Sequence, residues 1–251
     1  MTQHFYILTG GSRGMGAAMA QLLLQPGHWL ISISRGQHSG LDALAAQRGA
    51  RLDQWQHDLA APQAASTQLQ ALLESLASAQ PASATLINNA AALSPPGPLE
   101  QTDDADTVRA LRVGLEAPVL LTAAFLRATA NWTVPRRILN ISSGLGRRAM
   151  AGSSTYCAVK AGLDHFSRSV ALDEAAKPNG ARICSLAPGV IDTDMQVQLR
   201  SADPARFASQ GTFAALKENG QLSTPADAAK RVLDWLERAD FGENVVADVR
   251  G

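Results

Sequence analysis

Short apolar runs alternate with helix-like stretches along almost the whole chain, and this alternation restricts the fold more than any other feature. A short apolar run rich in β-branched residues is typical of a strand that is buried on both faces. Strands that alternate with helices form parallel sheets, because each helix carries the chain back to the start of the next strand. We therefore expect an α/β fold, a doubly wound parallel sheet of about seven strands with helices on both faces.

The positions of these elements follow from the same pattern. The expected strands are residues 4–9, 29–34, 51–56, 85–88, 137–142, 181–186 and 244–249. The expected helices are residues 17–24, 41–48, 63–79, 102–130, 154–176 and 226–238. Pro118 lies inside the fourth of these helices and predicts a kink there. We find no linker, low-complexity tract or internal repeat, so the 251 residues are expected to form one domain, 1–251.

Charge and cysteine content exclude several classes of partner. Lysine plus arginine equals aspartate plus glutamate at 22 each, which argues against broad nucleic-acid or anionic-membrane binding. Cys157 and Cys184 are the only cysteines and do not form a Cys-x-x-Cys pattern, so we expect a reduced protein without a metal site. The chain begins with a strand-like run rather than a signal peptide, and no apolar run approaches the roughly 20 residues that span a bilayer. These features predict a soluble, cytoplasmic protein.

A glycine-rich segment from Gly10 to Gly16 separates the first expected strand from the first expected helix. Glycines there let the backbone turn tightly and approach a pyrophosphate, which the positive end of a helix attracts. The spacing is Gly-x-x-x-Gly-x-Gly, a variant of the commoner Gly-x-Gly-x-x-Gly pattern. A simple turn is the alternative, but the strand–turn–helix context favours a dinucleotide site.

The second expected strand indicates which dinucleotide. Enzymes that prefer NAD usually end this strand with an acid that binds the ribose 2′-hydroxyl. Here the strand ends in Ser34-Arg35, and Arg13 lies in the glycine turn. Two guanidiniums without an acid favour a 2′-phosphate, because arginine forms charge-assisted contacts with phosphate. We therefore expect NADPH, with solvated surface arginines as the alternative interpretation.

Tyr156 and Lys160 lie four residues apart in an expected helix, and Ser143 lies thirteen residues before the tyrosine. Residues four apart share one helix face, a single turn from each other. A phenol is a poor acid at neutral pH, and a neighbouring ammonium is expected to lower its pKa. Ser143 follows a strand and would hydrogen-bond the same substrate oxygen, with Ser142 as the alternative serine. The pattern predicts a proton-transfer centre for a carbonyl or an alcohol, although such pairs also occur in helices for packing alone.

Taken in chain order, these motifs resemble the short-chain dehydrogenase/reductase superfamily. Besides the glycine turn and Tyr156-x-x-x-Lys160, the matching segments are His57-Asp58-Leu59, Asn88-Asn89-Ala90-Ala91, Asn140-Ile-Ser-Ser143 and Pro188-Gly189-Val-Ile-Asp-Thr193. The resemblance covers nearly all residues from 5 to 250. It implies one NAD(P)-binding domain of the Rossmann type and a dehydrogenase or reductase activity.

The resemblance also implies roles for individual residues, motif by motif. Asp58 would bind adenine, and the segment 88–91 would form the floor beside adenosine. Lys160 would bind the nicotinamide ribose, while Ile191 and Thr193 would meet the carboxamide. The full set of expected cofactor residues is Gly10, Ser12, Arg13, Gly14, Met15, Gly16, Arg35, Asp58, Leu59, Asn88, Asn89, Ala90, Tyr156, Lys160, Pro188, Gly189, Ile191 and Thr193.

Three local segments narrow the resemblance to sepiapterin reductases and bacterial benzil reductases, which reduce dicarbonyl compounds with NADPH. These segments are Tyr156-Cys-Ala-Val-Lys160-Ala, Ala187-Pro-Gly-Val-Ile-Asp-Thr-Asp-Met195-Gln and the ending Ala247-Asp248-Val. The resemblance implies an NADPH-dependent carbonyl reductase in which Ser143, Tyr156 and Lys160 are catalytic and Tyr156 donates the proton. The expected substrate contacts are Ser143, Tyr156, Gly189, Met195 and Asp248, the last at the position of the acid that anchors the pteridine in sepiapterin reductases.

Two other functions remain open. Within enzymes, the alternative is a general ketone or 3-oxoacyl reductase. From another class, the alternative is a non-catalytic NADP(H)-binding sensor. Gly114 is its only support, since it stands in Val113-Gly114-Leu115 where relatives usually carry an active-site asparagine that helps to hold a proton-relay water. We expect slower or differently routed proton resupply rather than inactivity.

Three further features are expected, the last of them from the resemblance. Residues 191–220 would fold over the substrate as a lid, with Met195, Leu199, Phe207 and Phe213 as candidate lining and ordinary packing as the alternative. Arg147 and Arg148 would attract an anionic substrate, or else form a solvated face. Helices 102–130 and 154–176 pair subunits in many relatives, which implies a homodimer or homotetramer.

Overall fold

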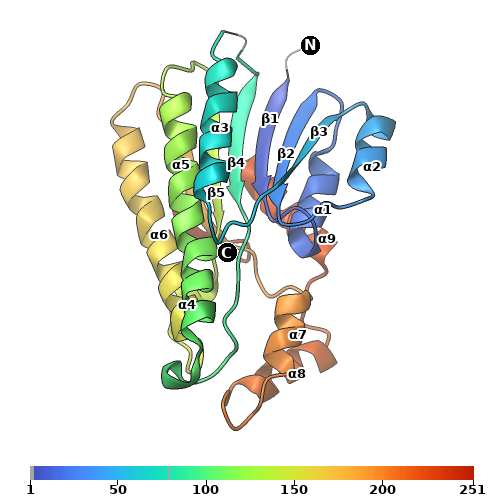
Figure 1. Ribbon diagram of the computed structural model, residues 1–251, viewed down its shortest axis with the longest axis vertical. Coiled ribbons are helices and arrows are strands. Elements are labelled where there is room, and N and C mark those ends of the chain that lie inside the picture. Colours follow the sequence, from blue (N-terminus) through green and yellow to red (C-terminus); the bar gives the residue numbers. More distant parts are fainter. Residues whose placement is uncertain (1–2, 79) are drawn as a thin grey trace.

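Seven parallel strands form one sheet in the order β3-β2-β1-β4-β5-β6-β7 (Figure 1). We describe a computed structural model that covers residues 3–78 and 80–251. The strands are β1 (His4–Thr9), β2 (His28–Ser34), β3 (Arg51–Gln56), β4 (Ser83–Asn88), β5 (Arg136–Ile141), β6 (Arg182–Ala187) and β7 (Val246–Asp248). This sheet confirms the fold class that the alternating pattern predicts.

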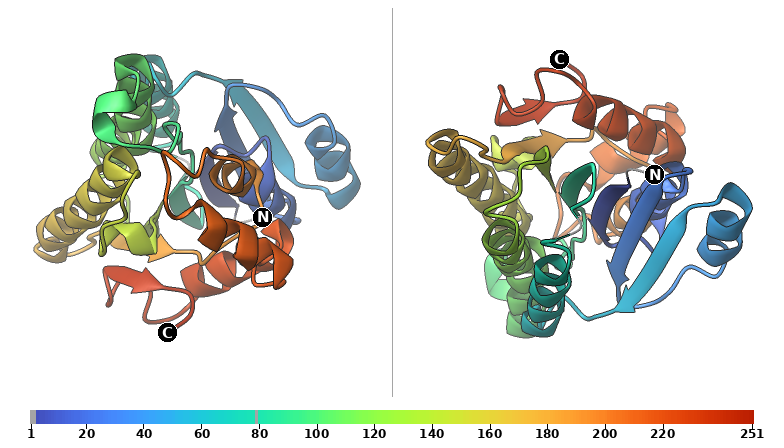
Figure 2. Two further views of the ribbon diagram at one scale, coloured as in Figure 1. Left: turned by 90° about the horizontal axis from the view of Figure 1, so that it is seen from below. Right: turned by 90° about the horizontal axis from the view of Figure 1, so that it is seen from above.

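Helices cover both faces of the sheet (Figures 1 and 2). One apolar layer is formed with α1 (Gly14–Leu23), α2 (Leu41–Arg48) and α9 (Pro225–Leu236). The other is formed chiefly with α3 (Gln63–Ser75) and α5 (Ala117–Ala128), and α6 (Ser154–Ala175) lies beside α5. The predicted helix 63–79 is therefore shorter than expected, and its residue 79 lies outside the described residues. No helix within residues 3–78 and 80–251 combines the length and apolar character needed to span a bilayer.

The expected single helix over residues 102–130 is wrong in detail. A short 3-10 turn, η1 (Leu99–Gln101), precedes α4 (Asp104–Leu111), which is followed by a π-helical turn, η2 (Arg112–Glu116), and then α5. Asp103 caps α4 by accepting a hydrogen bond from the Ala105 N–H at 2.7 Å. Pro118 lies in the first turn of α5, where its missing N–H and its ring are accommodated beside the widened π turn. The distortion therefore occurs as a π turn before the proline.

The carboxyl ends of the strands point toward α7 (Asp194–Arg200) and α8 (Gln210–Glu218), which lie together at one end of the molecule (Figure 1). These two helices lie within residues 191–220, the segment that the sequence analysis expects to act as a lid. Leu199, Phe207 and Phe213 form a small apolar cluster of their own in this region. Residues that follow the strands therefore share an edge of the sheet with α7 and α8.

Candidate active site

A cleft of about 1260 Å³ opens at the carboxyl ends of the strands. Nearly all of the residues that the sequence predicts to bind cofactor or substrate line this cleft. They are Gly10, Ser12, Arg13, Gly14, Met15, Gly16, Arg35, Asp58, Leu59, Asn89, Ala90, Ser143, Tyr156, Lys160, Pro188, Gly189, Ile191, Thr193 and Met195. The two exceptions are Asn88 and Asp248. The glycine turn and the tyrosine–lysine pair, far apart in the sequence, are thus brought to one cleft.

Asn88 directs its side chain away from the cleft. Its amide nitrogen donates to Asn140 Oδ1 at 2.8 Å and to Thr122 Oγ1 at 3.3 Å, and only 2% of the residue is exposed. Successive residues of a strand point to opposite faces, and Asn88 ends β4 pointing toward α5. Asn89 and Ala90 instead donate their N–H groups to Thr9 Oγ1, which holds this segment against the cleft. The predicted floor is thus formed without the Asn88 side chain.

The turn between β1 and α1 presents bare backbone to the cleft. Gly14 has φ +54°, a left-handed conformation that favours glycine, and only Thr193 approaches the position of a Cβ there. A Cβ on Gly16 would lie 2.0 Å from the Gly10 carbonyl oxygen, so the tight packing of the turn excludes a side chain. Arg13 at the N-cap makes no side-chain cap to α1. The first N–H groups of α1 therefore form an anion-attracting end at the cleft.

The end of β2 adds polar groups beside this turn. Ser34 lines the cleft, and its hydroxyl is buried and has no hydrogen-bond partner among the described residues. Arg35 follows it, is exposed and lines the cleft without an ion-pair partner within residues 3–78 and 80–251. Arg13 is instead paired with Asp194 at 2.9 Å, on an exposed surface. A free hydroxyl, a guanidinium and a bare helix end together fit a phosphate-bearing dinucleotide.

Tyr156 lies in the first turn of α6 and is half-buried in the cleft wall. Burial raises the pKa of the Tyr156 phenol above its usual value, and interaction with the Ser143 hydroxyl opposes that shift. The structure thus shows the opposite direction from the lowered phenol pKa that the sequence predicts, and Ser143 rather than Lys160 counteracts it. The phenol is therefore held in its protonated form at neutral pH.

The surroundings of Lys160 explain why this residue does little to lower the pKa of Tyr156. The side chain is buried, and its ammonium donates to the Ile141 carbonyl oxygen at 2.7 Å, 5.7 Å from the centre of the Tyr156 ring. Burial lowers the pKa of Lys160 from 10.5 to about 8, and the nearby Asp164 charge opposes this shift. The amine is therefore only partly charged in mildly alkaline solution.

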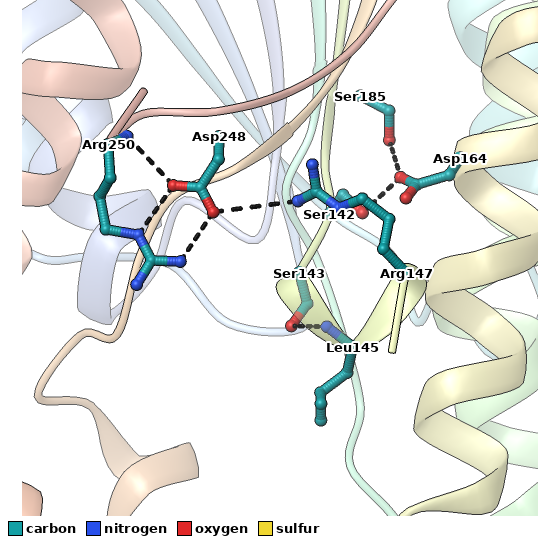
Figure 3. Close-up of polar contacts among 8 residues, drawn as sticks. All are labelled: Ser142, Ser143, Leu145, Arg147, Asp164, Ser185, Asp248 and Arg250. Carbon is teal, nitrogen blue, oxygen red and sulfur yellow. Dashed lines mark hydrogen bonds and ion pairs between the residues drawn. The ribbon is translucent and has the colours of Figure 1, made fainter. Parts of the chain in front are cut away.

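The two serines after β5 have different surroundings (Figure 3). The Ser142 hydroxyl donates to Asp164 Oδ1 at 2.5 Å, so its single proton is directed into the protein interior. Ser143 has extended backbone, and its hydroxyl accepts the Leu145 N–H at 3.2 Å, which leaves the hydroxyl proton free for the cleft. The geometry favours Ser143 over Ser142, as the spacing predicts.

Asp248 is engaged by arginines on both sides (Figure 3). Arg250 forms a bidentate pair with its carboxylate at 2.8 and 2.7 Å, and Arg147 lies 3.9 Å from Oδ2. Hydrogen bonding to Arg250 is the main reason that the pKa of Asp248 lies below its usual value. Arg250, and not Asp248, lines the cleft, with its Cδ 3.9 Å from where a Cβ on Gly189 would lie. The predicted acidic anchor is thus replaced at the cleft surface by a guanidinium.

Gly114 lies in η2 and packs directly against α6. A Cβ at this position would lie 2.5 Å from Val159 Cγ1. Val159 is itself buried, with 3% exposed, and precedes Lys160. The space into which a side chain at position 114 would point is therefore filled by valine from the neighbouring helix.

Some cleft residues lie outside the sequence prediction. Met195, Leu199 and Phe213 line the cleft as expected, whereas Phe207 is fully buried and stacks on Phe213 with 5.7 Å between ring centres. The unpredicted lining residues include Leu93, Arg109, Leu145, Met150 and Arg250. Arg109 carries no sequence signal for this place, because its contact at 3.7 Å with Asp58 depends on how α4 packs. Arg250 is two residues from the predicted Asp248, a spacing that allows pairing across a strand end.

Comparison with known proteins agrees with this geometry. The family model of short chain dehydrogenases matches residues 4–204. Benzil reductase ((S)-benzoin forming) from Bacillus cereus is 35% identical over 242 residues, covering 96% of this chain and 97% of the relative. Sepiapterin reductase from Xenopus tropicalis is 31% identical over 251 residues, covering 92% of this chain and 90% of the relative. A crystal structure of a short-chain dehydrogenase/reductase from Burkholderia vietnamiensis is 34% identical and superposes with a TM-score of 0.66, covering 100% of this chain and 98% of that one.

The match therefore extends beyond the motifs to nearly the whole chain, and it agrees with the parallel sheet. These findings support the resemblance to benzil and sepiapterin reductases that the local segments indicate. The chain belongs to the short-chain dehydrogenase family of oxidoreductases.

Proposed function

We propose that the protein is an NADPH-dependent carbonyl reductase that acts on ketones or dicarbonyl compounds. The observation that carries the proposal is that Ser143, Tyr156 and Lys160 line the same cleft as the glycine turn. One end of the cleft suits phosphates, and the other offers groups that hold and transfer a proton. Binding sites at the carboxyl ends of parallel strands are the general rule for open α/β sheets.

Tyr156 is the proton donor in this proposal. Its raised pKa keeps the phenol protonated at neutral pH, which is the form that a donor must have. Ser143 binds the carbonyl oxygen with its free hydroxyl proton and stabilises the negative charge that develops there. The phenolate that remains on Tyr156 is stabilised by the Lys160 ammonium on the same helix face.

The cofactor-binding residues are assigned from the cleft lining. The N-terminus of α1 with Ser12, Gly14 and Met15 would hold the pyrophosphate, and Arg35 would bind a 2′-phosphate. Asp58 with Leu59 would hold the adenine, and Pro188, Gly189, Ile191 and Thr193 would surround the nicotinamide. When bound, NADPH supplies a hydride to the carbonyl carbon. The charges of Arg13 and Arg35, with no acid at the end of β2, support NADPH over NADH.

The substrate class rests on the relatives and on the apolar lining. Two relatives are named for the reduction of benzil and of sepiapterin, so a dicarbonyl or an activated ketone is the preferred substrate. We propose that residues 191–220 act as a lid within a single domain, 1–251. Met195, Leu199 and Phe213 line the cleft from this segment and would exclude water from the substrate. We further propose a cytoplasmic homodimer or homotetramer, which rests on the family resemblance alone.

The test is the oxidation of NADPH by the purified protein, followed by its near-ultraviolet absorbance, with a panel of diketones, quinones, pteridines, simple ketones and 3-oxoacyl thioesters. We expect oxidation with aromatic diketones, and a roughly 100- to 10,000-fold loss of kcat in Tyr156→Phe without loss of NADPH binding. The chain has two tyrosines, so Tyr6→Phe is the matched control and should retain turnover.

The panel also separates the alternatives. Preference for 3-oxoacyl thioesters or simple ketones would favour the general reductase, and NADPH binding without oxidation of any compound would favour the sensor. Near-normal turnover in Tyr156→Phe would contradict the assignment of the proton donor.

A further inference from the structure

A buried aspartate lies one helical turn beyond Lys160 on the same face of α6. Asp164 is 1% exposed, and its Oδ1 accepts hydrogen bonds from Ser142 Oγ at 2.5 Å and Ser185 Oγ at 2.7 Å (Figure 3). A carboxylate this deeply buried is costly unless its surroundings compensate for it. The proposed proton transfer assigns it no role, and Asp164 does not line the cleft.

The two hydroxyl contacts join the segments that carry the proposed chemistry. Ser142 precedes Ser143 at the end of β5, and Ser185 lies in β6, just before Pro188 and Gly189. Asp164 therefore ties α6, which carries Tyr156 and Lys160, to both strand ends. A second contact fixes the same junction, because the Ser142 N–H donates to the Leu186 carbonyl at 2.8 Å. A shift of α6 would thus move the phenol relative to the serine hydroxyl.

The second carboxylate oxygen of Asp164 is not stabilised by a hydrogen bond. Oδ2 is buried and has no partner among the described residues. It faces Gly146: a Cβ there would lie 2.6 Å from Oδ2 and 3.0 Å from the Lys160 carbonyl oxygen. A charge in such a site acts over several ångströms, because the surrounding medium screens it poorly.

Lys160 is the cation best placed to feel this charge. Its ammonium donates to the Ile141 carbonyl, and Ile141 directly precedes Ser142, so the lysine and Asp164 hold adjacent residues of one segment. Burial and Asp164 account for the pKa of Lys160, and Asp164 is the group that raises it. Further charged side chains on or beside the elements packed against α6 are Arg112 and Glu116 of η2, Asp104, Asp106 and Arg109 of α4, Arg182 of β6, Asp248 of β7, and Arg147 and Arg148 after the 3-10 turn η3 (Gly144–Gly146).

We propose that Asp164 is a positioning residue that keeps the Lys160 amine charged and holds Ser143 in register with Tyr156. It acts through Lys160 and Ser142 and touches neither substrate nor cofactor. Asp164→Asn is the appropriate change, because an amide oxygen still accepts from both serines while the charge is lost.

The direct measurement is the titration of Lys160 by NMR in protein labelled at lysine Cε with 13C. The chain has only four lysines, Lys160, Lys177, Lys217 and Lys230, and a Lys160→Arg variant assigns the Lys160 signal. We expect Asp164→Asn to move the Lys160 titration from about 8 downward by roughly one unit or more. An unchanged titration in a folded Asp164→Asn variant would overturn the proposal.

Ser185→Ala is the matched control. It removes one hydrogen bond to Oδ1 and leaves the charge in place, so the thermal midpoint should fall while the Lys160 titration stays within a few tenths of a unit. An equal movement of the titration in Ser185→Ala and Asp164→Asn would show a packing effect and contradict the proposal. Should Asp164→Asn fail to fold, Asp164→Ser gives the same test with a smaller neutral side chain.

Catalysis supplies a second readout, and this arm alone rests on the proposed function. The reductase activity should decline as pH rises through the Lys160 pKa, and Asp164→Asn should move this alkaline limb to lower pH with KM for the carbonyl substrate unchanged. A purely structural role would lower kcat at every pH without moving the limb. Wild-type protein without NADPH oxidation would refute the proposed function and leave the NMR result standing.

Discussion

Gly114 and Val159 fit each other so closely that a single added carbon at position 114 would lie 2.5 Å from Val159 Cγ1. Real Cβ atoms do not approach a neighbour this closely, so the Val159 side chain or one of the two helices would have to move. Because Val159 precedes Lys160 on α6, a movement of α6 would reach the proposed proton-transfer centre. Gly114 therefore leaves room for the Val159 side chain at this contact.

An asparagine introduced at position 114, with no other change, should destabilise the protein. We expect Gly114→Asn to lower the free energy of unfolding by about 1–3 kcal/mol, because overpacking strains a buried contact. Adding Val159→Ala should recover much of this loss by opening space. Urea unfolding measures both, and Gly211→Asn is the control, since Gly211 is also helical but has open space around it. Equal unfolding free energies for the two asparagine variants would contradict this prediction.

A second stability prediction concerns the buried pair of Arg136 and Glu174. Both side chains are 2% exposed and lie 3.7 Å apart, and Glu174 also accepts the Ala181 N–H at 2.8 Å. Glu174→Gln leaves the guanidinium buried without a counter-charge, so we expect a loss of about 3–5 kcal/mol in urea unfolding. Glu237→Gln breaks an exposed pair with Arg137 and should change stability by less than about 1 kcal/mol. Similar losses in both variants would contradict the importance of burial.

Acid should remove the contribution of Glu174. Burial alone would raise its pKa, but hydrogen bonds from Lys177 and Ala181 and the charges of Lys177 and Arg136 bring the pKa below 4.5. A carboxyl with a depressed folded pKa stabilises the fold above its unfolded pKa and loses that contribution as pH falls through the folded value. The stability difference between wild type and Glu174→Gln should thus be full at about pH 7 and shrink below about pH 4.5. A difference that stays constant in acid would contradict this assignment.

Cofactor preference should depend mainly on Arg35. Arg13 is paired with Asp194, whereas Arg35 has no ion-pair partner in the described part of the chain. We expect Arg35→Ala to raise KM for NADPH by roughly tenfold or more, the equivalent of one charge-assisted contact. NADH lacks the 2′-phosphate and serves as the internal control, with KM little changed. A parallel rise for both cofactors would indicate a general loss of the site.

Asp248 and Arg250 should act on substrate as one unit. A double-mutant cycle with Asp248→Asn and Arg250→Met, read as kcat/KM for benzil, should show a coupling energy of about 1 kcal/mol or more. The reason is that Asp248 fixes the guanidinium that lines the cleft. If Asp248 instead contacts the substrate itself, Asp248→Asn will keep its full effect in the Arg250→Met background.

Local pattern was sufficient for much of the fold. The ranges 41–48 and 51–56 match α2 and β3, and Gly40 and Gly49 mark the limits of α2. The region 102–130 was not predictable in detail, since the π turn at 112–116 depends on Pro118 together with the packing of Gly114 on α6. Such packing is a property of two segments, and neither shows it alone.

The candidate site also divides into features that the sequence predicts and features that depend on how segments pack together. Most cleft residues follow strand ends or begin helices, and those places can be recognised in the sequence. The direction of a side chain cannot be recognised there. For this reason the sequence does not predict that Asn88 points toward α5 or that Asp248 binds Arg250. Asp164 is one turn from Lys160, but its burial between two serines depends on how β5 and β6 meet.

The short strand β7 has a practical consequence for anyone who handles this protein. It adds Val246–Asp248 to the edge of the sheet, and two residues later Arg250 lines the cleft. An affinity tag fused after Gly251 would therefore start one residue beyond a side chain that lines the proposed substrate site. β1 begins at His4, at the end of the sheet away from α7 and α8 (Figure 1), so purification handles and surface tethers are better placed before β1.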